Sequence, residues 1–362
     1  MNVDIIVGAR PNFIKAASLI NAIQNAQLNG KNIFFRLIHT GQHYDKNMSG
    51  SFFEQLDIPK PKFNLGVGAG TQAEQTAAIM IGYEKILLEE APDLCIVVGD
   101  VNSTMACSIT AKKIGIKVAH IEAGIRSNDL KMPEEINRIV TDSISDYFFT
   151  TTNESKLYLQ RQGVQDNKIF FVGNTMIDTL LRFRSKLKKP NLWKEINLEL
   201  KNYIVLTLHR PSNVDNEMKL KEIIERIIFS SNGHEIIFPV HPRTLKILEK
   251  LNIKSPKFHP VNPLSYLEFN YLVEKSKGVI TDSGGITEET TVMGIPCMTI
   301  RDNTERPETI TIGTNELIGT DPNSISFYVK KMIKNEWKKG GIPELWDGYA
   351  GDRIINHLIE SL

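Results

Sequence analysis

The sequence predicts an α/β protein built from two Rossmann-like, doubly wound domains whose parallel sheets face a cleft. Short apolar runs rich in β-branched residues alternate with longer amphipathic stretches along all 362 residues. Nearly continuous apolar strands separated by helices are typical of parallel sheets that are covered on both faces. The chain also exceeds the length at which one hydrophobic core keeps growing, so two domains are expected.

Apolar runs mark the expected strands in chain order. In the first half of the chain they cover Val3–Val7, Ile33–His39, Leu94–Val98, Val118–Ile121, Tyr147–Thr150 and Ile169–Val172. In the second half they cover Tyr203–Leu208, Glu235–Val240, Gly278–Thr281 and Cys297–Ile300. Ligands of such sheets bind outside the carboxyl ends of the strands, and with two domains the cleft between them is the expected site.

The domain boundary is expected directly after the last strand of the first half. The N-terminal Rossmann-like domain then covers residues 1–173, and the C-terminal one covers residues 174–346. The start of the second domain is rich in lysine before the strand pattern resumes. Residues 347–362 are predicted to form a helix, which we expect to pack back on the N-terminal domain.

Composition and charge are those of an ordinary soluble globular protein. The formal net charge is +1, with 41% hydrophobic and 23% charged residues. Because this charge gives no broad attraction to nucleic acid or to an anionic membrane, neither is an expected partner. No apolar run approaches the roughly 18–20 residues that span a bilayer, and no signal-peptide pattern is found. We therefore expect a cytoplasmic protein.

The three cysteines, Cys95, Cys107 and Cys297, stand far apart in apolar or small-residue contexts. They form no CxxC pair and no His/Cys cluster with the spacing of metal ligands. Buried, reduced thiols are therefore expected, without a disulfide framework and without a metal site.

The first strand ends in a glycine turn that is followed by Arg10 and, in the first turn of a predicted helix, Lys15. The turn does not match GxGxxG, so the dinucleotide fingerprint is absent. A helix N-terminus attracts anions through its unpaired N–H groups and dipole, and an arginine adds a fork that matches phosphate oxygens. The plain alternative is a tight turn with two solvated cations.

Two consecutive strands of the first half deliver carboxylates to one edge of the expected sheet. Asp100 follows Leu94–Val98, and Glu122 follows Val118–Ile121. Asp100 alone could be a helix N-cap. Stability does not require two acids at one sheet edge, whereas general acid–base chemistry does.

A third source of carboxylates is the predicted helix start at residues 132–138, which carries Glu134 and Glu135. Proline at the first helical position and acids in the first turn are typical of a helix N-terminus. Both acids lie within one turn of Arg138, so a structural salt bridge is the alternative to acid–base chemistry. That alternative has more weight for Glu134 than for Glu135.

Two consecutive strand ends of the second half carry a histidine close to an arginine. His209 directly precedes Arg210, and His241 lies two residues before Arg243. A single histidine at a strand end is more often structural. Two of them, each beside an arginine, are expected to present cations and donors to one cleft.

The most specific local pattern is the Ser283–Gly285 turn between a strand and a helix. Small residues let backbone N–H groups close on a diphosphate at the positive end of the helix. One turn further on, Glu288 or Glu289 can bind a pair of ribose hydroxyls. A tight turn would explain the glycines but not the acids. The charged segment 301–308 follows the next strand and could close over a ligand.

Together these motifs resemble those of the non-hydrolysing UDP-N-acetylglucosamine (UDP-GlcNAc) 2-epimerases. The segments that match that family in order and spacing are GARPNFIK, HTGQHYD, GDVNST, HIEAGIRS, MPEEINR, LHRP, VHP, DSGGITEE and RDNTERPE. The resemblance runs from about residue 5 to about residue 320. It implies a GT-B-like arrangement, a homodimer, and the interconversion of UDP-GlcNAc and UDP-ManNAc for cell-surface polysaccharide precursors.

The resemblance also implies roles for individual residues. Asp100, Glu122 and Glu135 match the three essential acids of the family, and His209 matches its catalytic-site histidine. The residues that match its ligand-binding set are Arg10, Lys15, His241, Ser283, Gly284, Gly285, Glu289 and Arg306.

The chemistry that the resemblance implies requires no cofactor. UDP leaves by anti elimination to give 2-acetamidoglucal, and it adds back after protonation of C2 from the other face. A C2 proton beside an amide is weakly acidic, so we expect a base with a pKa raised by burial. We expect Asp100 and Glu122 to serve elimination and readdition, while Glu135 shapes or shares the proton transfers.

Some bacterial members of that family bind UDP-GlcNAc at a second, activating site. Gln42 and His43 match residues of that site, but the loop at residues 65–72 lacks the matching arginine. The match to the second site is therefore incomplete: Gln42 and His43 stay candidate residues of such a site, without the arginine.

Other functions fit parts of the pattern. A 2-epimerase of a modified UDP-sugar, such as a 2,3-diacetamido-uronate or a deoxy-amino sugar, would carry the same motifs. A GT-B glycosyltransferase would share the fold and the UDP site but has less use for the clustered acids. The hydrolysing epimerases typically open with a different turn, and a catalytically silent nucleotide-sugar sensor would not need the acids.

Overall fold

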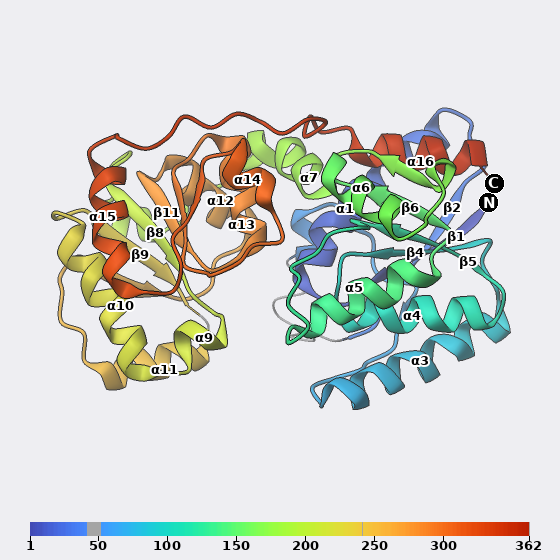
Figure 1. The fold of residues 1–362 in the computed structure, drawn as a ribbon, viewed down its shortest axis with the longest axis horizontal. Coiled ribbons are helices and arrows are strands. Elements are labelled where there is room, and N and C mark those ends of the chain that lie inside the picture. The colour runs from blue at the N-terminus through green and yellow to red at the C-terminus, as the bar shows by residue number, and fades with distance from the viewer. Residues whose placement is uncertain (42–51, 241, 362) are drawn as a thin grey trace. The chain divides into compact units, whose positions relative to one another are not determined.

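The computed structural model describes residues 1–41, 52–240 and 242–361, which fold into two compact units (Figure 1). Unit 1 comprises Met1–Arg182 and Glu344–Leu362, and unit 2 comprises Phe183–Pro343. Each unit is a parallel sheet with helices on both faces, so the predicted α/β class with two doubly wound parallel sheets is confirmed.

Within the described part of unit 1, seven strands form one parallel sheet in the order β3-β2-β1-β4-β5-β6-β7. The strands are β1 (Asn2–Val7), β2 (Phe34–His39), β3 (Phe63–Asn64), β4 (Leu94–Val98), β5 (Lys117–Ile121), β6 (Tyr147–Thr150) and β7 (Ile169–Phe171). The α-helices are α1 (Arg10–Leu28), α3 (Gln72–Glu89), α4 (Asn102–Lys113), α5 (Pro133–Ile144), α6 (Asn153–Arg161), α7 (Thr175–Phe183) and α16 (Ala350–Ser361). Helices α3, α4 and α5 cover one face of the sheet, and α1 and α16 cover the other (Figure 1).

Within the described part of unit 2, six strands form a second parallel sheet in the order β10-β9-β8-β11-β12-β13. The strands are β8 (Tyr203–Thr207), β9 (Glu235–Pro239), β10 (Phe258–Val261), β11 (Gly278–Thr281), β12 (Cys297–Thr299) and β13 (Asn315–Leu317). The helices are α8 (Leu192–Glu195), α9 (Pro211–Val214), α10 (Glu217–Ser230), α11 (Pro242–Leu251), α12 (Tyr266–Lys275), α13 (Gly284–Met293), α14 (Pro307–Thr311) and α15 (Pro322–Ile333).

The central strands are apolar because both of their faces are covered. Every residue of β4 is buried, and so are the first four residues of β8. Strands that face helices on both sides show continuous apolar runs instead of alternation, which is why the sequence revealed them. Cys95, Cys107 and Cys297 lie in these interiors as buried free thiols, as predicted.

The strand order of each sheet reverses at one point. In unit 1 the reversal lies between β1 and β4, and in unit 2 it lies between β8 and β11. At such a switch point the connections from neighbouring strands leave in opposite directions, which opens a crevice at the carboxyl ends of the strands. The loops that follow these four strands are therefore the expected places for ligand contacts.

Three strands, β3, β10 and β13, were not marked by the sequence patterns. All three are edge strands of at most four residues. Strand β10 reads Phe-His-Pro-Val, and its proline is tolerated because an edge strand needs no donor on its outer side. Half-exposed edge strands do not need a continuous apolar run, so their sequence signal is weak.

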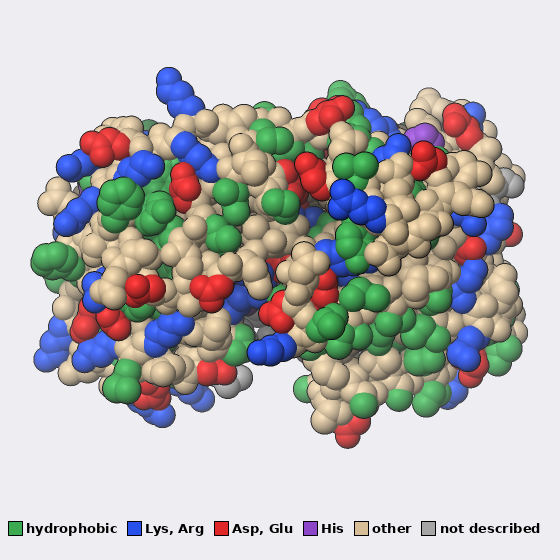
Figure 2. Space-filling view, viewed as in Figure 1, with side chains coloured by type: hydrophobic (Ala, Val, Ile, Leu, Met, Phe, Trp, Pro, Cys, Tyr) green, Lys and Arg blue, Asp and Glu red, His purple; other side chains and the backbone are tan. Residues whose placement is uncertain are grey.

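The surface carries both basic and acidic side chains on the face that Figure 2 shows. Within the residues that the structure describes, no helix is long and apolar enough to cross a membrane. On the face seen in Figure 2, basic and acidic side chains alternate over each unit. This mixture agrees with the net charge of +1.

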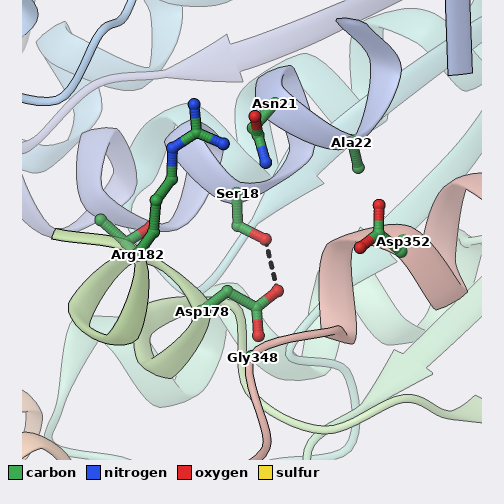
Figure 3. Close-up of a pocket in the computed structure, with 8 residues that line it drawn as sticks. Ser18, Asn21, Ala22, Asp178, Arg182, Gly348 and Asp352 are labelled. Atoms are coloured by element: carbon green, nitrogen blue, oxygen red, sulfur yellow. Dashed lines mark hydrogen bonds between the residues drawn. The ribbon is translucent and has the colours of Figure 1, made fainter. Parts of the chain in front are cut away.

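The C-terminal helix α16 packs on α1 within unit 1, and Asp178 on α7 holds its first turn. The Asp178 carboxylate accepts the Ser18 hydroxyl at 2.6 Å, the Ala350 N–H at 3.1 Å and the Gly351 N–H at 2.7 Å. Figure 3 shows the Ser18 contact at the edge of a cavity of about 70 Å³. The compact units differ from the predicted divisions in two places: residues 174–182, with most of α7, and residues 344–346 belong to unit 1. Asp178 on α7 joins α1 to α16, which accounts for the first difference.

Replacing Asp178 by alanine should lower the free energy of unfolding by about 1–3 kcal/mol, because two backbone N–H groups and a hydroxyl lose their buried acceptor. Urea unfolding followed by circular dichroism measures this. Asp352 lines the same cavity, and its change to asparagine should cost less than about 1 kcal/mol. Equal losses in the two variants would contradict this role for Asp178.

Candidate active site

At the switch point of unit 1, Lys15 and Glu122 form a buried ion pair. Lys15 on α1 donates to Glu122 Oε2 at 2.7 Å, and both side chains are more than nine-tenths buried. Glu122 directly follows β5, and Lys15 lies in the second turn of a helix that begins directly after β1. Two predicted site residues that are 107 positions apart are therefore in contact.

The backbone around this pair is held in unusual conformations. Glu122 has φ +69°, in the left-handed region that costs a residue with a side chain about 1–2 kcal/mol. Gly99, at the end of β4, has φ +69° as well, and a Cβ added there would lie 3.4 Å from Lys15 Nζ and 3.9 Å from Glu122 Oε2. Strained backbone that packing maintains is frequent at functional sites.

Asp100 and Glu135 are joined by Arg138 on α5. The two guanidinium amino groups donate one to Asp100 and the other to Glu135, the latter at 2.9 Å. Asn137 on the same helix donates to the backbone carbonyl of Asp100 at 2.8 Å. The Asp100 side chain is 29% exposed, whereas those of Arg138 and Glu135 are buried. The salt bridge considered from the sequence is thus present at Glu135, the acid for which that alternative had less weight than for Glu134, and Arg138 extends it to Asp100.

Glu135 is the most firmly held of the three acids. Its carboxylate accepts the backbone N–H groups of Ser127 at 2.9 Å and Asn128 at 3.0 Å as well as the Arg138 bond. Burial by itself would raise its pKa, but these three donors outweigh burial and lower the pKa below its ordinary value. Glu135 therefore keeps its charge and fixes the loop that precedes α5.

His120 ties the end of β4 to α5 from within the sheet. Its Nδ1 lies 2.7 Å from Asp142 Oδ1, and its Nε2 lies 2.8 Å from the Gly99 carbonyl oxygen. Asp142 also contacts Arg126 at 2.7 Å and accepts the Gly124 N–H at 3.1 Å. Burial opposes the charge of Asp142, yet His120 and Arg126 lower its pKa. This network supports the loops on both sides of Asp100 and Glu122.

At the switch point of unit 2, His209 contacts Asp282. Register pairs Thr207 of β8 with Thr281 of β11, so the residues that follow the two strands meet. His209 Nδ1 lies 2.7 Å from Asp282 Oδ1, with the His209 side chain 62% exposed and the Asp282 side chain fully buried. Burial opposes the charge of Asp282, but the donors around it lower its pKa.

The predicted diphosphate turn is the start of α13. Ser283 is its N-cap residue, and within residues 242–361 the Ser283 side chain makes no capping hydrogen bond to the helix. Ser283, Gly284 and Gly285 are partly exposed, whereas Thr287 to Met293 are buried. The first turn of α13 thus meets solvent while the rest of the helix lies in the interior.

Glu289 is buried in α13 and faces α12. Its Oε1 accepts the Tyr266 hydroxyl at 2.8 Å and the Asn270 amide at 3.3 Å. Burial raises the Glu289 pKa to about 7, against the lowering effect of these two donors, and the neighbouring Glu288 raises it further. Asn270 Oδ1 is buried without a hydrogen-bond partner among the described residues.

The neighbouring acid has a different partner. Glu288 pairs with Arg306 at 3.0 Å, and both side chains are buried. The sequence pattern left either Glu288 or Glu289 as the acid that binds a ribose. In the structure Glu288 is paired with Arg306, itself a predicted ligand-binding residue, whereas Glu289 faces α12.

The remaining predicted site residues are less informative. The Arg10 guanidinium lies 5.1 Å from the centre of the Phe52 ring. Gln42, His43 and His241 lie outside the described residues. Among the residues that are described, no group of three His, Cys, Asp or Glu side chains is arranged to hold a metal ion.

Sequence reasoning missed the partners that hold the candidate acids and histidine. Arg138 was seen only as a salt-bridge partner of its own helix, and His120, Asp282 and Tyr266 were not singled out. Asp282 had a signal, because it follows β11 as Asp100 follows β4. The others had none, since their partners lie on other elements.

Two doubly wound parallel sheets, each with a switch point, define an α/β protein of the GT-B-like fold class. A lipopolysaccharide outer core galactosyltransferase has a similar structure, with a TM-score of 0.55, at 14% identity over 100% of both chains. That likeness concerns the fold alone.

Closer similarities identify the family. The sequence model described as UDP-N-acetylglucosamine 2-epimerase matches residues 26–359. The UDP-N-acetylglucosamine 2-epimerase of Methanocaldococcus jannaschii is 43% identical over 370 aligned residues, which cover 99% of each chain. A crystal structure of the M. jannaschii enzyme in complex with UDP-GlcNAc and UDP has a TM-score of 0.87, 42% identity and full coverage of both chains. The chain belongs to the UDP-N-acetylglucosamine 2-epimerase family, which is a family of isomerases.

The family also contains a similar protein with another named substrate. The UDP-2,3-diacetamido-2,3-dideoxy-D-glucuronate 2-epimerase of Pseudomonas aeruginosa is 40% identical over 363 aligned residues, which cover 99% of each chain. Relatives of this chain at similar identity are thus named for two different UDP-sugar substrates.

The raised pKa of Glu289 predicts a pH-dependent stability. A carboxyl with a folded-state pKa of about 7 contributes stability at low pH, and this contribution is lost as pH rises from its ordinary value of 4.5 through 7. The free energy of unfolding of the wild type, relative to Glu289→Gln, should therefore fall between pH 5 and pH 8. Urea unfolding of both proteins at several pH values measures this, and a constant difference would contradict the prediction.

Proposed function

We propose that this protein is a non-hydrolysing 2-epimerase that interconverts UDP-GlcNAc and UDP-ManNAc. The observation that carries the proposal is the placement of three acids in unit 1: Asp100 and Glu122 follow the adjacent strands β4 and β5, Glu122 is paired with Lys15, and Arg138 joins Asp100 to Glu135. The named activity of the M. jannaschii relative, with 43% identity over 99% of each chain, supports the same reaction.

The reaction exchanges a proton at C2 and breaks one bond at C1. A base removes the C2 proton, the C–H electrons form a C1=C2 double bond, and the C1–O electrons leave with UDP. Protonation of C2 from the other face and attack of the UDP oxygen at C1 then give the epimer. Atoms and charge balance without a redox partner, so the protein must supply a base, an acid and stabilisation of the departing diphosphate.

Unit 1 supplies the acid–base groups in this proposal. Glu135 is a weak proton acceptor because its pKa is lowered, so it acts by positioning Arg138, which reaches Asp100. Asp100 is partly exposed and can meet a substrate. Glu122 shares its charge with Lys15, which can donate to a ligand oxygen when the pair separates. Asp100 and Glu122 are therefore the groups that move the C2 protons, and Arg10 is a further ligand contact at the start of α1.

Unit 2 supplies the nucleotide contacts. The exposed first turn of α13, with Ser283, Gly284 and Gly285, offers backbone N–H groups and the positive end of a helix to the diphosphate. Glu289 and Asn270 Oδ1, which has no hydrogen-bond partner among the described residues, accept hydroxyl or N–H donors of the nucleoside. We assign His209 to the reacting end of the same ligand, and His241 and Arg306 to its phosphates.

The decisive experiment incubates the protein with UDP-GlcNAc alone in deuterated water and follows the sugar protons by NMR. UDP-ManNAc should appear, with deuterium at C2 of both epimers and without an added acceptor. Asp100→Asn and Glu122→Gln should each lower the rate of exchange by about 100-fold or more. Asp352→Asn, a change away from these residues, should leave the rate unaltered.

Each alternative reaction has its own signature in that experiment. Release of free ManNAc and UDP would indicate a hydrolysing epimerase, and no turnover until an acceptor is added would indicate a glycosyltransferase. Neither turnover nor C2 exchange would indicate a nucleotide-sugar sensor. A wild-type rate of deuterium exchange at C2 in the Asp100→Asn protein would show that Asp100 does not transfer the C2 proton.

A second candidate substrate is UDP-2,3-diacetamido-2,3-dideoxy-D-glucuronate. The identity of 40% to the P. aeruginosa 2-epimerase is close to the 43% shared with the M. jannaschii enzyme. Both substrates would undergo the same chemistry at C1 and C2. The ratio of the two kcat/KM values, measured with the same protein, decides between them.

We also infer that the reaction is not activated by its own substrate. The loop at residues 65–72 carries no arginine that could hold a second nucleotide. Pure UDP-ManNAc should therefore be converted without a lag and with hyperbolic kinetics. A lag that traces of UDP-GlcNAc abolish would contradict this expectation.

A further inference from the structure

The carboxylate of Asp282, directly after β11, accepts four hydrogen-bond donors. The His209 N–H donates to it at 3.1 Å, the Arg210 N–H at 3.0 Å, and the Asn213 side-chain amide at 3.1 Å. The His209 ring adds Nδ1 at 2.7 Å. Asp282 therefore binds both the backbone and the ring of His209, and it does so from a fully buried position.

These contacts fix the state of the His209 ring. An ionised carboxylate only accepts hydrogen bonds, so Nδ1 must carry a proton and donate it to Asp282. Nε2 is then the ring nitrogen that can meet a ligand, and the side chain is 62% exposed. Because the next residue after Asp282 is the N-cap of α13, the same aspartate links the histidine to the first turn of that helix.

We propose that Asp282 is the positioning residue of His209: it holds the ring by its Nδ1–H and directs Nε2 toward the diphosphate end of the ligand at the start of α13. The catalytic part of this inference rests on the proposed function. In that reaction the His209 ring acts as an imidazolium, with Nδ1–H on Asp282 and Nε2–H on the departing UDP oxygen. The ring keeps both protons through elimination and readdition, so no proton is gained or lost. The negative charge of Asp282 stabilises this cation, and the neutral carboxamide of Asp282→Asn would not.

An asparagine in place of Asp282 separates positioning from simple support. The carboxylate accepts with both oxygens, Oδ1 from the His209 ring and Oδ2 from Arg210 N–H and Asn213. A carboxamide has one oxygen and one donor group. Backbone N–H groups cannot lose their protons, whereas an imidazole can change tautomer, so the NH2 group should face the ring. His209 Nδ1 would then become an acceptor and the proton would move to Nε2.

The experiment compares long-range ¹H–¹⁵N NMR spectra of His209 in the wild type and in Asp282→Asn, at a pH of about 9, where imidazoles are neutral. The His209→Gln spectrum assigns the signal among the 8 histidines. The wild type should show the Nδ1–H tautomer and Asp282→Asn the Nε2–H tautomer. With UDP-GlcNAc, kcat of the variant should fall by at least about tenfold, while KM changes by less than about threefold.

Two controls accompany the variant. Asn213→Ser removes another donor from Asp282 and should leave the Nδ1–H tautomer in place. Asp178→Asn alters a buried aspartate of unit 1 and should leave kcat unchanged even where it lowers stability.

Three results would overturn the proposal. They are an Nε2–H tautomer in the wild type, an unchanged tautomer in Asp282→Asn, and an inverted tautomer with unchanged kcat. The first needs only the wild-type protein, so the proposal can fail even if the variant does not fold. If the wild type does not turn over UDP-GlcNAc, the proposed function fails by itself, and the two spectra decide whether Asp282 positions His209.

Discussion

Burial of both faces of a parallel sheet is the constraint on which this structure depends. Strand β4 is buried at every position, and a polar side chain inside such a sheet needs buried partners, as His120 of β5 has in Asp142 and the Gly99 carbonyl. Polar groups that meet a ligand are left with the carboxyl ends of the strands, and the reversal of strand order there makes room for the ligand. Asp100 and Glu122 in unit 1 lie just after the carboxyl ends of β4 and β5. His209 and Asp282 in unit 2 lie just after those of β8 and β11.

The same burial makes pairing obligatory. Removing a carboxylate from water is costly, and breaking a buried pair by deleting one partner typically costs about 3–5 kcal/mol. Glu122 has Lys15, and Asp142 has His120 and Arg126. The resulting networks hold side chains in one arrangement, and this arrangement compensates for the left-handed backbone of Glu122. Rigidity at these strand ends is therefore a consequence of solvation as much as of packing.

The sequence was informative where local pattern and chemistry coincide. Central strands were predicted because they are continuously apolar, and acids at their ends were recognised because Asp100 and Glu122 follow such strands. Partners across the fold were not predictable: His209 and Asp282 are 73 residues apart, and their contact depends on the register of β8 with β11. The short edge strands and the unit to which α7 belongs were not predicted for a similar reason, because tertiary contacts determine both. The roles of the site residues toward a ligand stay predictions.

The placement of α16 has a consequence for the order in which the chain matures. Unit 2 is a continuous insert, whereas unit 1 is interrupted and ends with the last helix. The contact between Asp178 and Ala350 spans 172 residues, so unit 1 closes a loop that contains all of unit 2. During synthesis unit 2 leaves the ribosome whole while unit 1 still lacks its final helix. A premature stop codon that removes α16 therefore destabilises unit 1, most of which was synthesised before unit 2.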